Sequence, residues 1–238
     1  MNIWISGANR GLGYEAAAEA IRRGHSVIAC CRNPQKDGER LYALQDHCPG
    51  RVVIAELSIT DEAMVEKHAA QLQEQGTRID AIINNAAVLV GREHSLEELQ
   101  LDNMRSSFEI NVFAPMNVVK HLLPFMKQRA DESAEPAVIM NVSSEAGSIH
   151  HAYGGDYPYA MSKAALNMFS QQLRSYVEAR GIHVYSVHPG WMRTDMGGAN
   201  APTDPADSAR GMLDLIEQRV EAHTRLAFID YLGRPMDI

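Results

Sequence analysis

The chain has 238 residues, of which 45% are hydrophobic and 22% charged, so it is long enough to form one large globular domain with a substantial core. Its formal net charge of −8 and its pI of about 5.7 argue against general binding to nucleic acid or to an anionic membrane. No apolar run reaches the roughly 18 residues of a transmembrane helix, and the N-terminal residues lack the pattern of a signal peptide. We therefore expect a cytoplasmic protein whose partners include neither nucleic acid nor membrane.

Strand-like and helix-like segments alternate along the whole chain. Seven apolar runs predict strands: 2–6, 26–31, 52–57, 79–84, 137–142, 183–188 and 226–230. Helices are predicted between them: 12–23, 35–47, 61–75, 96–129, 158–180 and 205–223, with the polar stretch 129–135 as a loop. Several runs are apolar almost throughout, as expected of strands buried on both faces of a parallel sheet. We predict an α/β fold, a Rossmann-like doubly wound parallel sheet with helices on both faces, in a single domain spanning 1–238.

The first predicted strand leads into a glycine-rich turn and then into a run of helix-forming residues. The turn is Gly7-Ala8-Asn9-Arg10-Gly11-Leu12-Gly13, with glycines in a G-x-x-x-G-x-G arrangement. A strand, a glycine turn and a helix N-terminus together make a phosphate cradle, because free backbone N–H groups and the positive end of the helix dipole point at the anion. The spacing differs from the common G-x-G-x-x-G fingerprint, so this turn by itself is equally consistent with an ordinary strand-to-helix connection.

Candidate ligand-binding residues follow the carboxyl ends of most of the predicted strands. They are Gly7–Gly13 after the first strand, Arg32 after the second, Asn85-Ala86 after the fourth, Ser143-Ser144 after the fifth and Pro189-Gly190 after the sixth. In open parallel sheets, ligands bind beyond the carboxyl ends of the strands, near the point where the strand order reverses. These segments are therefore expected to meet at one edge of the sheet.

Tyr159 and Lys163 stand four residues apart in a predicted helix, so they lie on one helix face. A free phenol has a pKa of about 10, too high for proton transfer near neutral pH. A neighbouring ammonium favours the phenolate and makes tyrosine a usable acid or base. The pattern is weak alone, and it gains weight from the nucleotide-site features at the other end of the chain.

The whole chain resembles the short-chain dehydrogenase/reductase family in its single-domain form, on several motifs in the family's order. They are Ser6-Gly7-x-x-x-Gly11-x-Gly13, Asn84-Asn85-Ala86-Ala87, Asn111, Asn141-Val142-Ser143-Ser144, Tyr159-x-x-x-Lys163 and His188-Pro189-Gly190. The segment 188–198 is similar to that of NADPH-dependent carbonyl reductases and C-factor-like proteins. The resemblance implies one dinucleotide-binding and catalytic domain.

The resemblance also implies a catalytic tetrad. Tyr159 is expected to donate a proton to the carbonyl oxygen as hydride arrives from the nicotinamide, and Lys163 to lower the pKa of Tyr159 and to hold the nicotinamide ribose. Ser144, rather than Ser143, is expected to hydrogen-bond the substrate oxygen. Asn111 is expected to hold a water that links Lys163 to solvent.

The residues around the second strand favour NADPH over NADH. Enzymes that use NAD tend to place an acidic residue at the end of that strand, where this chain has Cys31 followed by Arg32. Arg10 in the glycine turn supplies a second guanidinium, and the two can bracket a 2′-phosphate. Both arginines could equally be solvated surface residues.

The resemblance extends the predicted cofactor site to further positions. These are Gly7, Asn9, Gly11, Leu12, Gly13, Asn85, Ala86, Pro189, Gly190 and Thr194, in addition to Tyr159 and Lys163. Ser58 stands where the family commonly has an aspartate that contacts adenine, so the adenine contact is expected to be weaker. Ala87 replaces the family's usual glycine.

The predicted substrate-binding residues lie in two loops without readable periodicity. They are His150, Tyr153, Trp191 and Met192, and each could instead serve only packing within its loop. The interval from Ser144 to Tyr159 is slightly longer than is usual in the family, which predicts an unusual substrate-facing loop at 145–158.

No metal site is predicted from the sequence. Cys30, Cys31 and Cys48 lack metal-ligand spacing and are expected to be reduced. The remaining histidines outside the loops form no metal-like cluster in the sequence.

Two functions remain open at this stage. The intact tetrad favours an NADPH-dependent reductase of aldehydes or ketones, and the alternative is an NADPH-binding signalling or regulatory protein of the C-factor type. The predicted helices 96–129 and 158–180 are the surfaces that relatives use for contact between subunits, so a homodimer or homotetramer is expected.

Overall fold

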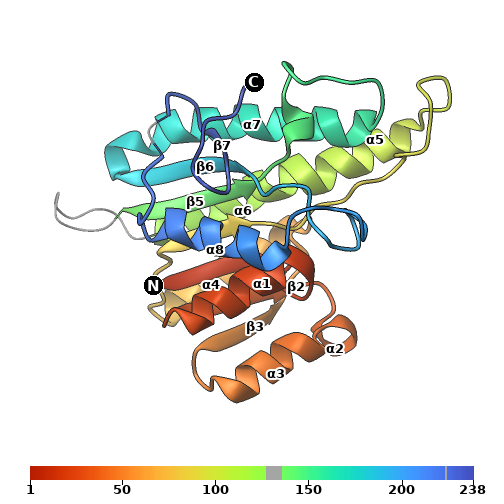
Figure 1. Cartoon of the computed structure of the whole chain (residues 1–238). Helices are drawn as coiled ribbons and strands as arrows, with labels where there is room; N and C mark the ends of the chain where they lie inside the picture. The colour runs from red at the N-terminus through yellow and green to blue at the C-terminus, as the bar shows by residue number, and fades with distance from the viewer. Residues whose placement is uncertain (127–135, 223) are drawn as a thin grey trace.

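The computed structural model describes residues 1–126, 136–222 and 224–238 of the chain (Figure 1). Seven parallel strands form one sheet in the order β3-β2-β1-β4-β5-β6-β7. The strands are β1 (Asn2–Ser6), β2 (Ser26–Cys31), β3 (Val52–Glu56), β4 (Ala81–Asn84), β5 (Ala137–Val142), β6 (Ile182–His188) and β7 (Phe228–Asp230). The predicted fold class, a doubly wound Rossmann-like sheet, is confirmed. The predicted loop 129–135 lies outside the described residues.

The central strands are apolar, and helices bury them on both faces of the sheet. Every residue of β4 and β5 is buried, and β1 shows how alternate side chains serve opposite faces. Ile3 and Ile5 pack with α1 (Gly11–Arg22) and α8 (Pro205–Ile216) on one face. Trp4 points into the core of the other face, which the remaining long helices cover.

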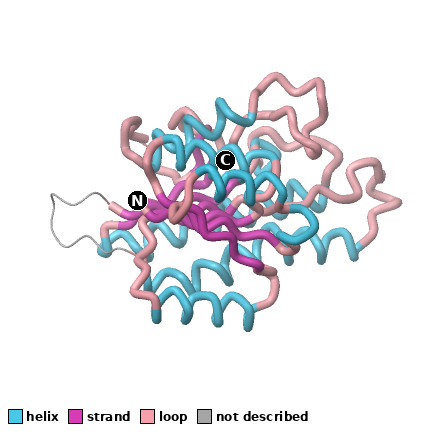
Figure 2. Tube along the Cα trace, turned by 90° about the horizontal axis from the view of Figure 1, so that it is seen from below, coloured by secondary structure: helices cyan, strands magenta, loops and turns pink. Residues whose placement is uncertain are grey.

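Helices form a layer on each side of the sheet, as Figure 2 shows. One layer contains α1, α8 and the short pair α2 (Pro34–Asp37) and α3 (Glu39–His47). The other contains α4 (Glu62–Glu74), α5 (Leu101–Phe108), α6 (Ala114–Leu122) and α7 (Tyr157–Val177). The helix-forming segments of the sequence are thus placed as predicted, with helices on both faces.

Three predicted helices were wrong in extent. The helix expected over 35–47 is broken at Gly38, which ends α2 and precedes α3; a Cβ at this position would lie 2.4 Å from the carbonyl oxygen of Pro34, so the break requires glycine. The helix expected over 96–129 begins only at Leu101 and contains a π-helical turn. The helix expected over 205–223 ends at Ile216, and Gln218 then adopts a left-handed backbone conformation that stops it.

The strand order reverses between β1 and β4, which are neighbours in the sheet. The chain winds outward from β1 through β2 to β3, and from β4 through β5 and β6 to β7. The carboxyl ends of all seven strands lie at one edge, and the loops after β5 and β6 extend from that side in Figure 1. A crevice at this position is where such folds bind ligands.

The three cysteines are free, as predicted, and burial raises the pKa of the Cys30 thiol.

Among the residues that the structure describes, no helix is long and apolar enough to cross a membrane.

An ion-pair network fastens α1, whose N-terminus lies at the ligand edge, to α8. Arg23 is almost buried and bonds to Glu19 at 2.6 Å, to Asp214 at 2.7 Å and to Glu217 at 2.6 Å. Removing one member of a buried network leaves its partners with uncompensated charge. Arg23 is thus the cation that all three carboxylates share.

We expect Arg23→Met to lower the free energy of unfolding by about 2 kcal/mol, because three carboxylates lose their shared cation. Urea denaturation followed by circular dichroism measures the change. Arg22→Met is the control, since Arg22 also bonds Glu19 but its side chain is mostly exposed. Equal losses for the two variants would contradict this account of the network.

Candidate active site

Tyr159 lies in the first turn of α7, and Lys163 follows one turn later on the same face. The ammonium nitrogen of Lys163 lies 5.5 Å from the centre of the Tyr159 ring. Lys163 is buried and donates a hydrogen bond of 2.8 Å to the carbonyl oxygen of Val142, the last residue of β5. This bond anchors the lysine to the carboxyl edge of the sheet.

The two serines after β5 face different surroundings. The buried Ser143 hydroxyl donates to the side-chain oxygen of Asn167 at 2.6 Å, inside the protein. Ser144 is half-buried, accepts a hydrogen bond from the backbone N–H of Ala146 at 3.2 Å, and hydrogen-bonds the Tyr159 phenol. The structure thus places Ser144 beside Tyr159 and gives Ser143 a packing role.

Asn111 lies in a π-helical turn, Glu109–Phe113, between α5 and α6. Its side-chain oxygen accepts from the N–H of Val88 at 2.9 Å, and its amide donates to the carbonyl of Val88 at 2.9 Å and to Ser162 at 3.0 Å. Pro115 follows four residues later and has no N–H to give to the Asn111 carbonyl, so a regular α-helix fails here. The side chain ties the loop after β4 to α7.

Burial is the main cause of the pKa shifts of Tyr159 and Lys163. It raises the pKa of Tyr159, against an opposing effect of the Ser144 hydrogen bond and of the Arg92 charge. It also lowers the pKa of Lys163 to about 7, since the charged form loses its hydration. The net shift of the Tyr159 pKa is upward because desolvation outweighs the neighbouring charges, and the lowering effect of Lys163 that the sequence predicted stays a prediction.

Arg92 and Asp156 belong to the site's surroundings and were missed from the sequence. Asp156 is buried, precedes α7 and has a φ of +46°, a left-handed conformation that aspartate tolerates better than most residues. Its carboxylate accepts from Arg92 at 3.3 Å and from the Tyr153 hydroxyl at 2.8 Å. The Gly154-Gly155-Asp156 run just before Pro158 is a helix-start signal that could have drawn attention to it.

Tyr153 is held by that carboxylate at the mouth of the loop before α7. Burial together with the Asp156 hydrogen bond raises the pKa of Tyr153 to about 12. The phenol is therefore protonated at neutral pH, and it donates this proton to the Asp156 carboxylate.

The glycine turn is packed tightly against the end of β4. A Cβ on Gly13 would lie 2.2 Å from the carbonyl oxygen of Gly7, and Gly7 has a φ of +63°. The Asn85 amide donates to the carbonyls of Ser6 at 3.0 Å and of Gly7 at 3.1 Å. Asn85 therefore braces the turn with its side chain.

The N-terminus of α1 opens onto this edge without a side-chain cap. Gly11, with a φ of +52°, has the methyl group of Thr194 3.6 Å from where its Cβ would be. The turn after β1 and the loop after β6 thus come close to each other at the carboxyl edge of the sheet. An uncapped helix N-terminus offers free N–H groups to an anion.

The two arginines that are predicted to bind the 2′-phosphate differ in their ion pairing. Arg10 forms an ion pair of 2.7 Å with Asp195, and both side chains are mostly exposed. Arg32, just beyond β2, is exposed and forms no ion pair with any residue that the structure describes. Arg32 is thus the more available of the two guanidiniums.

The other predicted cofactor residues lie on the same edge with different orientations. The Leu12 side chain is in the core, so only its backbone is available there. The Asn9 amide points to the carbonyl of Asp37, at 3.5 Å. Ser58 shares a hydrogen bond of 3.1 Å with Thr60, and the Ala86 N–H bonds the Ser6 hydroxyl at 3.1 Å.

The loop after β6 is shaped by Pro189, which is buried, and Gly190. Gly190 has a φ of +83°, and a Cβ there would lie 2.8 Å from the Thr203 hydroxyl. Met192 pairs with Thr203 in a β-bridge, and the exposed Trp191 donates from its indole nitrogen to the carbonyl of Gly197 at 2.8 Å. Trp191 is engaged within its own loop in this structure.

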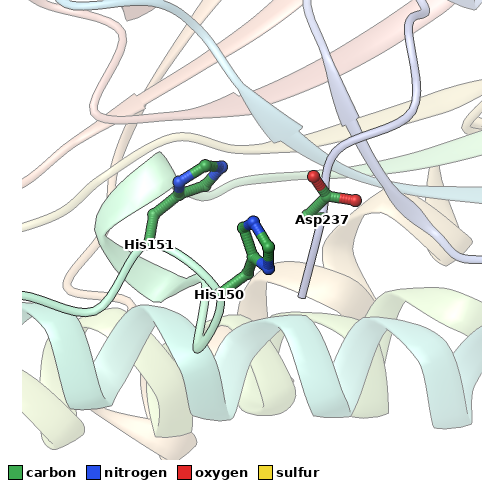
Figure 3. A group of neighbouring side chains, drawn as sticks. All are labelled: His150, His151 and Asp237. Carbon is green, nitrogen blue, oxygen red and sulfur yellow. The ribbon is translucent and has the colours of Figure 1, made fainter.

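His150 is exposed on the inserted loop and lies beside His151 and Asp237 (Figure 3). Of the four predicted substrate-binding residues, Tyr153 is the one that the structure links to the tetrad, through Asp156.

The match to known proteins agrees with this geometry. The short chain dehydrogenase family model matches residues 1–205. The chain belongs to the short-chain dehydrogenase family. It is 36% identical over 156 residues to the C-signal protein of Myxococcus xanthus, an alignment that covers 65% of this chain and 90% of that protein.

Solved structures of family members superpose on the whole chain. The carbonyl reductase Sniffer of D. melanogaster gives a TM-score of 0.91 at 27% identity, covering 100% of this chain and 99% of that one. An NADPH-bound carbonyl reductase from chicken fatty liver gives a TM-score of 0.85 at 30% identity, covering 100% and 98%. The predicted family membership is thereby confirmed.

The buried lysine predicts a pH-dependent stability. The pKa of Lys163 is about 7 in the folded protein and 10.5 for the unperturbed side chain. Between these values the unfolded chain binds more protons, so this group makes the free energy of unfolding rise with pH. Lys163→Met lacks the contribution, so its stability relative to the wild type should fall between pH 7 and pH 10.

Urea denaturation of both proteins across this pH range measures the effect. The exposed Lys67 on α4 supplies a control, Lys67→Met, whose stability relative to the wild type should stay nearly constant. A constant difference for Lys163→Met would show that the lysine is not the group responsible.

Proposed function

We propose that the protein is an NADPH-dependent reductase that transfers hydride to the carbonyl of an aldehyde or ketone, with Tyr159 as the general acid. One observation carries this proposal. The half-buried Ser144 and the desolvated Tyr159–Lys163 pair meet at the sheet edge, next to an uncapped helix N-terminus and a tight glycine turn. Relatives that include carbonyl reductases support the same reading.

The residues at this edge fit a dinucleotide with a 2′-phosphate. The free N–H groups of α1 and the close-packed glycines suit a pyrophosphate. The exposed Arg32 suits the 2′-phosphate, with Arg10 as a second cation if it leaves Asp195. Ser58, Ala86 and Thr194 complete the proposed contacts.

When bound, NADPH supplies the hydride that reduces the carbonyl carbon. Ser144 donates a hydrogen bond to the carbonyl oxygen and stabilises the negative charge that develops there. The Tyr159 hydroxyl transfers its proton to the same oxygen and completes the alcohol. The phenol, whose pKa is raised, carries a proton at neutral pH, and it can give that proton to the developing alkoxide because an alkoxide is the stronger base.

Lys163 and Asn111 are proposed to return a proton to Tyr159. A lysine with a pKa of about 7 can gain and lose its proton near neutral pH. The Asn111 side chain is already bonded to Val88 and Ser162, so its main-chain carbonyl, which Pro115 leaves without an α-helical partner, is the proposed water site.

A signalling or regulatory role of the C-factor type is the second candidate. It is favoured by the 36% identity to the C-signal protein. In that case NADPH binding would persist without appreciable turnover.

Self-association is proposed through the exposed side of α6 and α7. Phe113, Met168 and Tyr176 are each more than half exposed there, and a groove of about 760 Å³ runs between the two helices. An apolar face of this kind suits a homodimer or homotetramer. Cytoplasmic localisation likewise stays a prediction.

Tyr159→Phe tests the proposed activity. NADPH oxidation is measured at saturating cofactor across a panel of aldehydes, ketones and quinones. We expect the variant to lose roughly 10²–10⁴-fold in kcat, because it lacks the acidic proton. Tyr176→Phe, on the exposed side of α7, should retain activity.

Cofactor fluorescence establishes that both variants still bind NADPH. Wild-type protein that binds NADPH but turns over no member of the panel would move the signalling role ahead. Turnover that survives in Tyr159→Phe would overturn the assigned role of the tyrosine.

Arg32→Ala tests the cofactor preference. The variant should raise KM for NADPH by about tenfold or more, since a charge-assisted contact to the 2′-phosphate is lost. KM for NADH, which lacks that phosphate, should change little. Arg105→Ala on α5 is the control, and equal effects on both cofactors would refute a 2′-phosphate contact.

A further inference from the structure

Two histidines and a carboxylate from segments far apart in the sequence meet on the surface. Ligand atoms of His150, His151 and Asp237 all lie within 4.8 Å of one another, and all three side chains are exposed (Figure 3). The two imidazole rings stand edge to face with centres 4.8 Å apart. Neither imidazole hydrogen-bonds another residue that the structure describes, so their nitrogens are available.

A tight turn presents both imidazoles together. The N–H of Ala152 bonds the carbonyl of Ile149 at 3.2 Å, which makes His150 and His151 the two central residues of a four-residue turn. The N–H of His151 also bonds the hydroxyl of the buried Ser148, at 3.3 Å. The histidines therefore project from a turn whose backbone is held in place by two hydrogen bonds.

Asp237 is held near them by the last strand. After β7 the chain folds back, and the N–H of Met236 bonds the carbonyl of Phe228 at 3.1 Å. Ile229 and Pro235 form an antiparallel bridge in the same turn. The residue before Asp237 is thus fixed to the sheet.

The donor set of two imidazoles and one carboxylate is one that Zn²⁺ accepts in proteins. A tetrahedral ion with ligands at about 2.1 Å needs ligand atoms about 3.4 Å apart. The present ligand atoms lie within 4.8 Å of one another, on exposed side chains that have room to turn toward a shared ion. A fourth coordination position remains for water.

We propose that His150, His151 and Asp237 form a zinc site that ties the loop before α7 to the C-terminal segment. The loop continues through Tyr153 and Asp156 to Tyr159, so a bound ion restricts the segment that leads into the catalytic helix. The site is distinct from the tetrad: the charges that act on Tyr159 are those of Arg92 and Asp156, with no histidine among them. Its role is to order the loop, and it stands whatever reaction the tetrad performs.

Calorimetric titration of ZnCl₂ into untagged full-length protein tests this site. We expect one saturable site per chain with a dissociation constant in the micromolar range. His150→Ala, His151→Ala and Asp237→Asn should each weaken binding by about tenfold or more, because each removes one of three ligands. His47→Ala, which removes an exposed histidine on α3, is the matched control and should bind zinc like the wild type.

Hydrogen exchange with and without ZnCl₂ distinguishes one defined zinc site from nonspecific binding of zinc over the protein surface. Amide exchange should slow in residues 148–152 and 231–238 together, and not in the His150→Ala variant. The proposal is overturned if the wild type shows no saturable binding at millimolar zinc, or if the ligand variants bind as tightly as His47→Ala. Slowing that is absent from either segment would equally refute the link between loop and tail.

Discussion

The rest of this structure depends on the hydrogen-bonded contact between the ends of β1 and β4. The Ser6 hydroxyl accepts from the N–H groups of Asn85 and Ala86, while the Asn85 amide donates back to the carbonyls of Ser6 and Gly7. This contact fills the point at which the strand order reverses, so the glycine turn has no room for a Cβ at Gly13. The position of α1, and with it the anion-binding N–H groups, follows from that packing.

Burial is the second determinant, because it sets the proton chemistry of the candidate site. Lys163 is held inside the protein by the Val142 carbonyl, where water does not stabilise its charge. The same desolvation raises the pKa of Tyr159. A lysine with a pKa near neutrality beside a protonated phenol suits proton delivery to a developing oxyanion. This is the chemistry that we propose for this protein.

The loop that is proposed to shape substrate access is joined to α7, the helix that carries Tyr159, by polar contacts of its own. Asp156, immediately before α7, accepts hydrogen bonds from Arg92 and Tyr153. These bonds couple the inserted loop to the start of the helix that carries Tyr159. The proposed zinc ligands lie farther out on the same loop and reach the end of the chain. Substrate choice and loop order are therefore expected to vary together in this protein.

The sequence by itself predicted the doubly wound parallel sheet and the edge at which the motif residues meet, because near-continuous apolar runs leave few alternatives to a parallel sheet. The tetrad followed from the family resemblance, and the roles of its residues stay a prediction. The sequence could not decide the direction of the Tyr159 pKa shift, since desolvation depends on how many neighbours surround the phenol. It also missed the break at Gly38 and the Arg92–Asp156 pair, and it could not bring Asp237 to His150. Only the tertiary structure decides such contacts, because they join residues far apart in the chain whose proximity no local periodicity encodes.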